Sequence, residues 1–309
     1  MTGPDAPGRT PGAPRVALVT GGSRGVGKGV ATALAAAGWT VYVTGRSVER
    51  LQGTVDAAAD GPGEVRALEC DHGSDEQIAA VFTRIAADAG RLDLLVNNVW
   101  TNPKGFMGFN GRFWERPTAD WDALMGIGLR AHYVACCEAA KIMVPQGSGL
   151  MVNISSFGSR APFHTVLYGM SKTALDKMAS DMAHELAGTG VATLSLWLGL
   201  IRTELILSLG MDDFNGFPLD RAEDPTFVGR VIDALTHDPG LAAMSGATVI
   251  TAEYGREHGI VNDDGEVPLS HRGSFGGGPL FPPVTDAQLG IEPVAEVAEA
   301  GGHNGFAGG

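Results

Sequence analysis

Short apolar runs rich in β-branched residues alternate along the chain with longer, alanine-rich stretches of helical periodicity. Strands that alternate with helices predict a parallel sheet covered by helices on both faces. The pattern therefore predicts an α/β fold built on a doubly wound, seven-stranded parallel sheet. The runs expected to form strands are RVALVT, TVYVTG, EVRALEC, LDLLVN, GLMVNIS, VATLSLWL and GATVIT.

Helical periodicity follows four of these runs, and every run except the last is followed by a helical stretch or a loop. Prolines at positions 117, 145 and 162 are expected to mark the helix edges. Residues 200–224 keep no clear period, and we expect a lid over the substrate there. The predicted helices are Gly25–Ala37, Asp75–Ala89, Thr118–Val144 and Tyr168–Leu186.

The ends of the chain differ in composition from its centre. Residues 1–13 are rich in Pro and Gly and are expected to be a disordered leader. Residues 14–270 are expected to form a single domain, since α/β folds of this length often do. Residues 271–309 become Gly-rich, which predicts a C-terminal tail.

Charge and cysteine content exclude several classes of function. A net charge of −13 without a basic stripe argues against a nucleic-acid partner. The three cysteines, Cys70, Cys136 and Cys137, lack the spacing of a disulfide framework or a metal site, which fits a reducing compartment. The first fifteen residues carry no signal-type apolar region, and no later apolar stretch is long enough to span a bilayer. We therefore expect a soluble, cytoplasmic protein with no metal and no membrane contact.

A glycine-rich segment, TGGSRGVG at positions 20–27, joins the first predicted strand to the first predicted helix. Glycines let a backbone turn tightly and approach a pyrophosphate, and a helix N-terminus offers N–H groups to phosphate. Turns also use glycine without any ligand, and a methyltransferase has a similar loop. The strand-to-helix context favours a Rossmann-type dinucleotide site.

The end of the second predicted strand bears on the choice of dinucleotide. An NAD site would place an Asp or Glu there against the ribose 2′-hydroxyl, but the sequence reads Thr44-Gly45-Arg46. Arg46 and Arg24 would instead offer guanidinium groups to a 2′-phosphate, unless both are ordinary surface residues. NADP(H) is therefore the preferred cofactor, with NAD(H) as the alternative. Asp71 is a candidate for the adenine amino group or for a helix N-cap region.

Tyr168 and Lys172 stand four residues apart in a predicted helix, so their side chains share one face. A nearby ammonium is expected to lower the pKa of a phenol and to bring it into range for proton exchange with an alcohol or carbonyl. A serine at the end of the fifth strand could hold the carbonyl oxygen. A YxxxK spacing is weak by itself, and its position behind such a strand makes it specific.

Together, TGGSRGVG, the Asn97-Asn98 pair, NISS at 153–156, YGMSK at 168–172 and LGLIRT at 198–203 resemble the short-chain dehydrogenase/reductase family across residues 14–260. FWERPTADWDALMGIGLRAHY and SLWLGLIRTEL resemble a narrower group, the type of dehydrogenase/reductase SDR family member 1, associated with NADPH-dependent reduction of carbonyls, including steroids and xenobiotic ketones. The resemblance implies a homodimer or homotetramer and catalysis by Ser156, Tyr168 and Lys172. It implies cofactor contacts from Gly21, Ser23, Arg24, Gly25, Val26, Arg46, Asp71, Asn97, Tyr168, Lys172, Ile201 and Thr203.

The sequence departs from the family pattern at several points. Trp100 follows the asparagine pair, Leu198 replaces the proline of a Pro-Gly pair, and Gly128 stands where a helix asparagine usually completes a proton relay. These changes predict a less rigid nicotinamide loop and leave a catalytically weak dinucleotide sensor or interaction protein as the alternative to a carbonyl reductase. The catalytic serine is also ambiguous: Ser155 has the usual distance from Tyr168, whereas Ser156 keeps the strand register and is preferred. Aromatic residues in segment 102–116, including Phe106, Phe109, Phe113 and Trp114, could either bind a flat substrate or pack against the following helix.

Overall fold

The computed structural model describes residues 15–101, 112–162, 164–214 and 216–277. Its centre is a seven-stranded sheet in the order β3-β2-β1-β4-β5-β6-β9, in which every neighbouring pair is parallel. The order reverses between β1 and β4, which creates the crevice where doubly wound sheets bind ligands. The predicted fold class is thus confirmed, and each strand lies on a predicted run: β1 (Val16–Val19), β2 (Thr40–Gly45), β3 (Glu64–Glu69), β4 (Leu94–Asn97), β5 (Gly149–Ser156), β6 (Val191–Leu198) and β9 (Thr248–Ile250).

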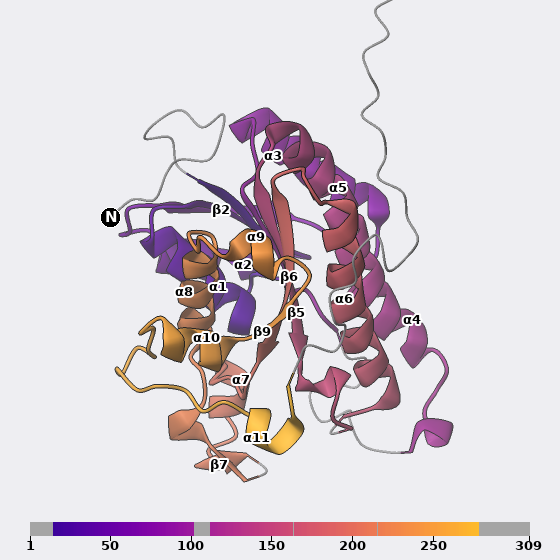
Figure 1. The fold of residues 1–309 in the computed structure, drawn as a ribbon, viewed down its shortest axis with the longest axis vertical. Helices are drawn as coiled ribbons and strands as arrows, with labels where there is room; N and C mark the ends of the chain where they lie inside the picture. Colours follow the sequence, from indigo (N-terminus) through magenta and orange to yellow (C-terminus); the bar gives the residue numbers. More distant parts are fainter. Residues whose placement is uncertain (1–14, 102–111, 163, 215, 278–309) are drawn as a thin grey trace, which may run out of the picture.

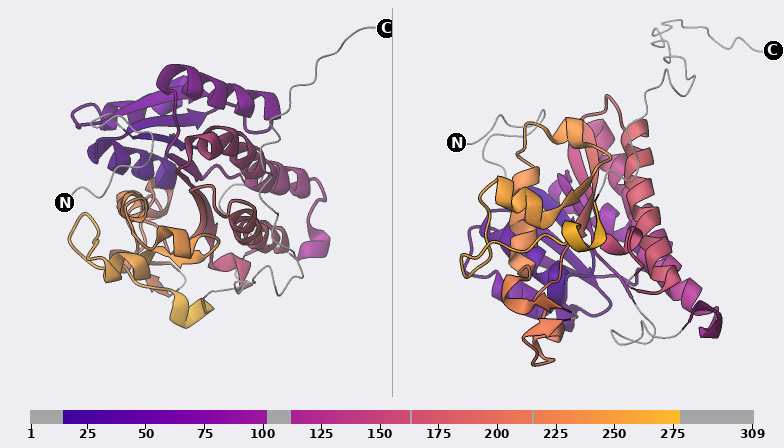
Figure 2. Two further views of the ribbon diagram at one scale, coloured as in Figure 1. Left: turned by 45° about the horizontal axis from the view of Figure 1, so that its top comes forward. Right: turned by 60° about the horizontal axis from the view of Figure 1, so that its bottom comes forward.

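Helices cover both faces of the sheet, as Figures 1 and 2 show. Successive strand residues point to opposite faces, so Ala17 and Val19 join one apolar core while Val16 and Leu18 join the other. On one face pack α1 (Gly25–Ala36), α2 (Val48–Ala57), α8 (Pro225–Leu235) and α10 (Thr251–Glu257); on the other pack α3 (Asp75–Ala89), α5 (Ala131–Gln146) and α6 (Val166–Glu185).

The structure corrects parts of the predicted helix pattern. The stretch Thr118–Val144 is not one helix, because a π-helical turn, η3 (Gly126–Arg130), separates α4 (Asp120–Met125) from α5. Pro145 lies inside α5 rather than beyond it. The last strand leads directly into α10. The predicted helices did not include α2 and α8, although Ser47 before α2 and Asp224-Pro225 at α8 are helix start signals.

The segment after β6 and the C-terminal region also contain regular structure. Within the expected lid lie α7 (Glu204–Leu207), a two-stranded hairpin of β7 (Asp213–Phe214) and β8 (Phe217–Pro218), and the short turn η5 (Leu219–Arg221). The described chain continues past residue 270 into α11 (Arg272–Phe275), where Phe275 packs beside the core residues Phe157 and Trp197. Among the described helices, none combines the length and apolarity needed to cross a membrane.

Glycines permit the close crossing of α1 and α8 on one face. A Cβ on Gly229 would lie 2.6 Å from Ala33 Cβ and 2.9 Å from Val30 Cα. A Cβ on Gly29 would lie 2.2 Å from Pro225 Cβ. The two helices therefore pack at a separation that no larger residue allows, and this contact holds α1 in place behind the glycine-rich loop.

We expect Gly229→Ala to destabilise the protein by about 1–3 kcal/mol, because the added methyl group overpacks a contact between two buried helices. Denaturant unfolding followed by circular dichroism measures the change. Gly53→Ala is the matched control: Gly53 lies within α2, nothing lies within 4 Å of a Cβ placed there, and alanine should gain up to about 1 kcal/mol of helix stability. Equal stabilities of Gly229→Ala and the wild type would contradict the proposed packing limit.

Candidate active site

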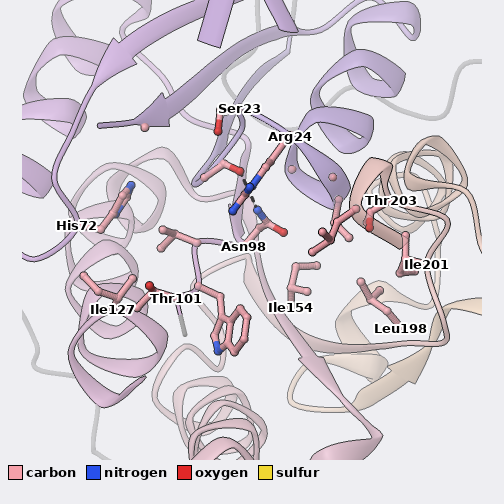
Figure 3. A pocket seen from close by; sticks show the side chains of 18 of the residues that line it. Ser23, Arg24, His72, Asn98, Thr101, Ile127, Ile154, Leu198, Ile201 and Thr203 are labelled. Atoms are coloured by element: carbon pink, nitrogen blue, oxygen red, sulfur yellow. Dashed lines mark hydrogen bonds between the residues drawn. The ribbon is translucent and has the colours of Figure 1, made fainter. Parts of the chain in front are cut away.

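A large cleft of about 1590 Å³ opens at the carboxyl ends of the strands. Ordinary small-molecule sites measure roughly 300–1,000 Å³, so the cleft has room for a dinucleotide and a second ligand. Figure 3 shows its walls converging from the loops after several strands. All the predicted cofactor residues except Asn97 line it, together with Ser155, Ser156, Tyr168 and Lys172.

The glycine-rich loop brings backbone into the cleft. Gly21 and Gly25 adopt positive φ angles of 71° and 54°, which favour glycine. A Cβ on Gly27 would lie 2.3 Å from the carbonyl oxygen of Gly21, so no side chain fits there. The carboxylate of Glu204 accepts a hydrogen bond from the amide of Gly25 at 2.9 Å. An anionic oxygen thus already contacts this helix N-terminus, which fits a pyrophosphate site.

The two asparagines after β4 have different surroundings. Asn98 lines the cleft, and its Nδ2 donates to the carbonyl oxygens of Thr20 at 2.9 Å and Gly21 at 3.1 Å, which braces the glycine-rich loop. Asn97 is fully buried, and its Nδ2 donates to Asn153 Oδ1 at 3.0 Å. Since neighbouring strand residues point to opposite sides, only one of the pair can face the cleft. Asn98, and not the predicted Asn97, is therefore the member of the pair that lines the cleft.

Three exposed arginines border one end of the cleft, and Ser23 lies with them. Arg24 and Arg46 are the predicted pair. Arg50, on the first turns of α2, is a third that the sequence pattern did not single out, because α2 was not predicted. Among the residues that the structure describes, no acidic side chain pairs with any of the three guanidinium groups. They are available to an anionic ligand, which fits a 2′-phosphate.

Asp71 and His72 lie on the neighbouring wall, after β3. Asp71 Oδ1 accepts from the amide of Gly73 at 2.9 Å, while Ser74 rather than Asp71 is the N-cap of α3. His72 is buried, and its Nε2 lies 2.8 Å from Thr44 Oγ1. Its Nδ1 is buried without a hydrogen-bond partner among the described residues. The unpartnered Nδ1 of His72 could form a hydrogen bond with a heterocyclic base such as adenine at this wall.

The predicted catalytic residues meet at the other side of the cleft. The hydroxyl oxygens of Ser156 and Tyr168 lie 2.9 Å apart. Lys172 Nζ donates to the carbonyl oxygen of Ile154 at 2.9 Å and lies 5.7 Å from the centre of the Tyr168 ring. The side chain of Thr165 caps α6 by accepting from the amide of Tyr168 at 3.2 Å, which fixes the start of the helix that carries both residues.

The geometry favours Ser156 over Ser155 as the functional serine. Ser155 borders the cleft, but it is buried and its hydroxyl donates to the carbonyl oxygen of Lys172 at 3.2 Å. That bond joins the end of β5 to α6. Ser156 alone presents its hydroxyl to Tyr168.

Burial controls the charge states of this group. It raises the pKa of Tyr168 to about 12, although the hydrogen bond from Ser156 acts to lower it. It also lowers the pKa of Lys172 to about 8, against the charge of Asp176, which acts to raise it. The expectation that Lys172 lowers the phenol pKa is therefore wrong for this structure. The cost of placing a phenolate in a buried site exceeds any attraction to the ammonium.

Trp100 occupies the space next to Gly128, where the resemblance expects an asparagine. A Cβ on Gly128 would lie 3.4 Å from Trp100 Cδ1, and a longer side chain would meet the indole. The Trp100 ring also contacts the Tyr168 ring edge-on, with centroids 5.8 Å apart. The indole of Trp100 thus takes space that a larger side chain at position 128 would need, so the two departures from the family pattern go together. The π-helical turn η3 places Gly128 at this point, and such turns are frequent at functional sites.

His164 and Trp100 were not identified as site residues from the sequence, yet both line the cleft. The His164 ring lies edge-on to Tyr168 at 4.6 Å, and burial lowers its pKa to about 4, so the imidazole is neutral. The position of His164, four residues before Tyr168, was the only signal available. Phe113 and Trp114 are exposed and contact each other, whereas Phe106 and Phe109 lie outside the described residues.

Comparison with known proteins agrees with this geometry. The short chain dehydrogenase family model matches residues 15–212. The chain is 36% identical over 262 residues to mouse (Mus musculus) dehydrogenase/reductase SDR family member 1, covering 81% of this chain and 84% of the relative. It belongs to the short-chain dehydrogenase/reductase family. It is thus an NAD(P)-dependent oxidoreductase, and its likeness to the narrower group named above is also confirmed.

Two further relatives are relevant to the site. Carbonyl reductase family member 4 of Xenopus laevis is 31% identical, with 73% of this chain and 92% of that protein covered. A crystal structure of a metagenomic short-chain oxidoreductase in complex with NADP is 29% identical, with a TM-score of 0.64 over 76% of this chain and 96% of the other.

Replacing each of the two serines by alanine tests the assignment of Ser156 as the functional serine. We expect Ser156→Ala to lower kcat by on the order of 10²–10³-fold, the cost of removing one hydrogen-bond donor from a developing oxyanion. Ser155→Ala is the matched control and should keep kcat within a few-fold while losing about 1 kcal/mol of stability with its buried hydrogen bond. Steady-state kinetics and thermal unfolding separate the two effects. A larger loss of kcat in Ser155→Ala would reverse the assignment.

Proposed function

We propose that this protein is an NADP(H)-dependent carbonyl reductase that transfers hydride between nicotinamide and a ketone, an aldehyde or the corresponding alcohol. The observation that carries the proposal is the pairing of Ser156 and Tyr168 hydroxyls at 2.9 Å beside Lys172, at the inner wall of a dinucleotide-sized cleft. The catalytic residues are Ser156, Tyr168 and Lys172.

Each of the three residues has a distinct task. When bound, the nicotinamide supplies the hydride in reduction or accepts it in oxidation. Ser156 donates a hydrogen bond to the carbonyl oxygen, and Tyr168 passes its proton to the same oxygen as the carbon becomes tetrahedral. Lys172 replaces that proton and binds the nicotinamide ribose. Because burial keeps the pKa of Tyr168 near 12, the phenol is protonated at neutral pH and is ready to donate its proton in reduction.

The arginines support a preference for NADP(H) over NAD(H). Arg24, Arg46 and Arg50 border the cleft where the ribose 2′-position would lie, and no acid follows β2 to accept a 2′-hydroxyl. The metagenomic relative in complex with NADP supports the same choice. Cofactor contacts are proposed from the remaining cleft residues: Gly21, Ser23, Gly25, Val26, Asp71, Asn98, Tyr168, Lys172, Ile201 and Thr203.

The wall around Tyr168 suggests a hydrophobic carbonyl substrate. This wall contains the indole ring of Trp100, the neutral imidazole of His164 and the aliphatic side chain of Leu198. Leu205 of α7 adds an exposed apolar side chain at the same opening. These surroundings suit an uncharged ketone or aldehyde. We further propose a cytoplasmic homodimer or homotetramer, which rests on the family resemblance and the cysteine content.

Reduction assays test the proposal directly. NADPH should be consumed, with loss of its near-ultraviolet absorbance, when aliphatic, aromatic, quinone and steroid carbonyls are offered. Tyr168→Phe should lower kcat by about 10²–10⁴-fold, since it removes the proton donor, while leaving the Kd for NADPH within a few-fold. Tight NADPH binding without turnover of any carbonyl would instead favour the alternative, a dinucleotide sensor, which the change at Gly128 supports.

Arg46→Ala tests the choice of cofactor. We expect the KM for NADPH to rise about ten- to hundredfold with the loss of a charge-assisted hydrogen bond, and the KM for NADH to stay the same. Arg84→Ala is the control, because Arg84 is an exposed arginine on α3 that pairs with Asp88 away from the cleft. A parallel rise in both KM values would indicate that Arg46 does not contact a 2′-phosphate.

A further inference from the structure

The loop after β6, residues Leu198–Thr203, forms a wall of the cleft that begins at the end of β6 and reaches the glycine-rich loop at Thr203. Leu198, Gly199, Ile201 and Thr203 all line the cleft. The sequence predicts a loose loop here, because Leu198 replaces a residue that would stiffen the chain. Two consecutive amides of this loop, those of Gly199 and Leu200, instead donate to buried side chains that lie behind it.

Glu223 accepts the first of these hydrogen bonds. The amide of Gly199 donates to Glu223 Oε1 at 2.9 Å, and the side chain of Glu223 is 1% exposed. The Glu223 backbone adds two more bonds to the loop, accepting from the amide of Arg202 at 2.9 Å and donating to the carbonyl oxygen of Leu200 at 2.8 Å. One residue thus fixes the loop at three points.

His271 accepts the second bond. The amide of Leu200 donates to His271 Nε2 at 3.1 Å. His271 is 5% exposed and lies in a cluster of aromatic rings, 4.5 Å from Phe217 and 6.0 Å from Phe157 between ring centroids. It comes from the segment before α11, which Figure 1 shows in yellow beneath α10. The C-terminal segment therefore supports the cleft wall.

Gly199 is required for this arrangement. A Cβ at Gly199 would lie 2.7 Å from His271 Cδ2 and 3.0 Å from Glu223 Oε1. The two acceptors press against the backbone on one side of Gly199 while the cleft lies on the other. Glu223 and His271 can therefore reach the loop only because position 199 has no side chain.

The hydrogen bonds around Glu223 form a complete set when its carboxyl is protonated. Thr251 Oγ1 lies 2.8 Å from Glu223 Oε2 and 3.2 Å from the carbonyl oxygen of Trp197. A protonated Oε2 can donate to Thr251, whose hydroxyl then donates to Trp197. Burial raises the pKa of Glu223 to about 7, and burial also lowers the pKa of His271. The guanidinium of Arg202, whose amide bonds to the Glu223 carbonyl oxygen, pairs with Asp224 and Asp264 instead.

We propose that Glu223 and His271 are positioning residues that hold the amides of Gly199 and Leu200 and so set the nicotinamide-side wall of the cofactor site. The C-terminal segment that carries His271 is then part of the cofactor-binding machinery. This inference rests on the proposed function, which assigns the loop Leu198–Thr203 to the nicotinamide half of NADP(H). It explains how a loop that lacks a stiffening proline keeps a defined shape.

Paired substitutions test the proposal in the full-length protein. Glu223→Gln keeps the acceptor for Gly199 and donates to Thr251, whereas Glu223→Leu removes both bonds. His271→Gln keeps an acceptor near the position of Nε2, whereas His271→Leu removes it. We expect the leucine variants to raise the Kd and KM for NADPH about tenfold each, the effect of losing a hydrogen bond of ordinary strength. The glutamine variants should stay within about threefold of the wild type.

Asp120→Asn serves as the control for loss of a buried polar contact. Asp120 is 4% exposed and pairs with Arg116 at 2.8 Å, outside the cleft lining. The Asp120→Asn substitution should lower the unfolding temperature without changing the Kd for NADPH. Wild-type affinity in both leucine variants would overturn the inference while leaving the proposed function intact. Failure of the wild type itself to bind NADPH would overturn the proposed function.

A comparison across pH keeps the inference testable even where a leucine variant does not fold. Ionisation of Glu223 above its pKa of about 7 places a carboxylate in a buried site that no described cation pairs with. The wild type should then lose NADPH affinity relative to Glu223→Gln as the pH rises past that value. Titration of the cofactor phosphates affects both proteins and cancels in the ratio. A ratio that does not change with pH, together with unchanged affinity in whichever leucine variants fold, would contradict the positioning role.

Discussion

Parallel hydrogen bonding of β1, β4, β5 and β6 is the constraint on which the site depends. Because these strands run in one direction, their carboxyl ends meet at one edge, and residues far apart in the chain converge there. The register pairs Ser156 with Leu198 across β5 and β6, which brings the functional serine beside the nicotinamide-side loop. A shift of one residue in that register would turn Ser156 away and present Ser155 instead. The strand pairing therefore selects the chemistry as well as the fold.

Close approach of backbone segments is the second requirement, and it couples distant parts of the chain. The glycine-rich loop is held by Asn98 from β4, and α1 behind it is held by Gly229 of α8. On the wall formed by the loop after β6, Gly199 lets Glu223 and His271 reach the loop amides. Gly229, Glu223 and His271 thus support the two walls from behind without lining the cleft themselves. Such support holds a site more firmly than loop residues do by themselves.

The sequence predicted the sheet well, because fully buried parallel strands leave an unambiguous apolar run. It did not predict α2 and α8, although Ser47 caps α2 and Asp224-Pro225 begins α8 as ordinary start signals do, and Arg50 was missed together with α2. Ser156 could be preferred from strand register alone, whereas the choice between Asn97 and Asn98 needed the direction of each side chain. The pKa of Tyr168 was beyond reach, because burial arises from tertiary packing and outweighs the neighbour four residues away. Glu223 and His271 carry no local motif, and their roles follow only from contacts between segments far apart in sequence.

Burial also determines which form of Tyr168 is present before any reaction. Desolvation raises the pKa of Tyr168 from 10.0 to about 12 and lowers that of Lys172 from 10.5 to about 8, so the two values move apart and the ammonium becomes the stronger acid. With this order of pKa values, a proton passes favourably from the ammonium to the phenolate that forms during reduction. The phenol remains the resting form, however, which means that oxidation must first remove its proton. The buried surroundings of Tyr168 therefore keep its hydroxyl in the form that can donate a proton.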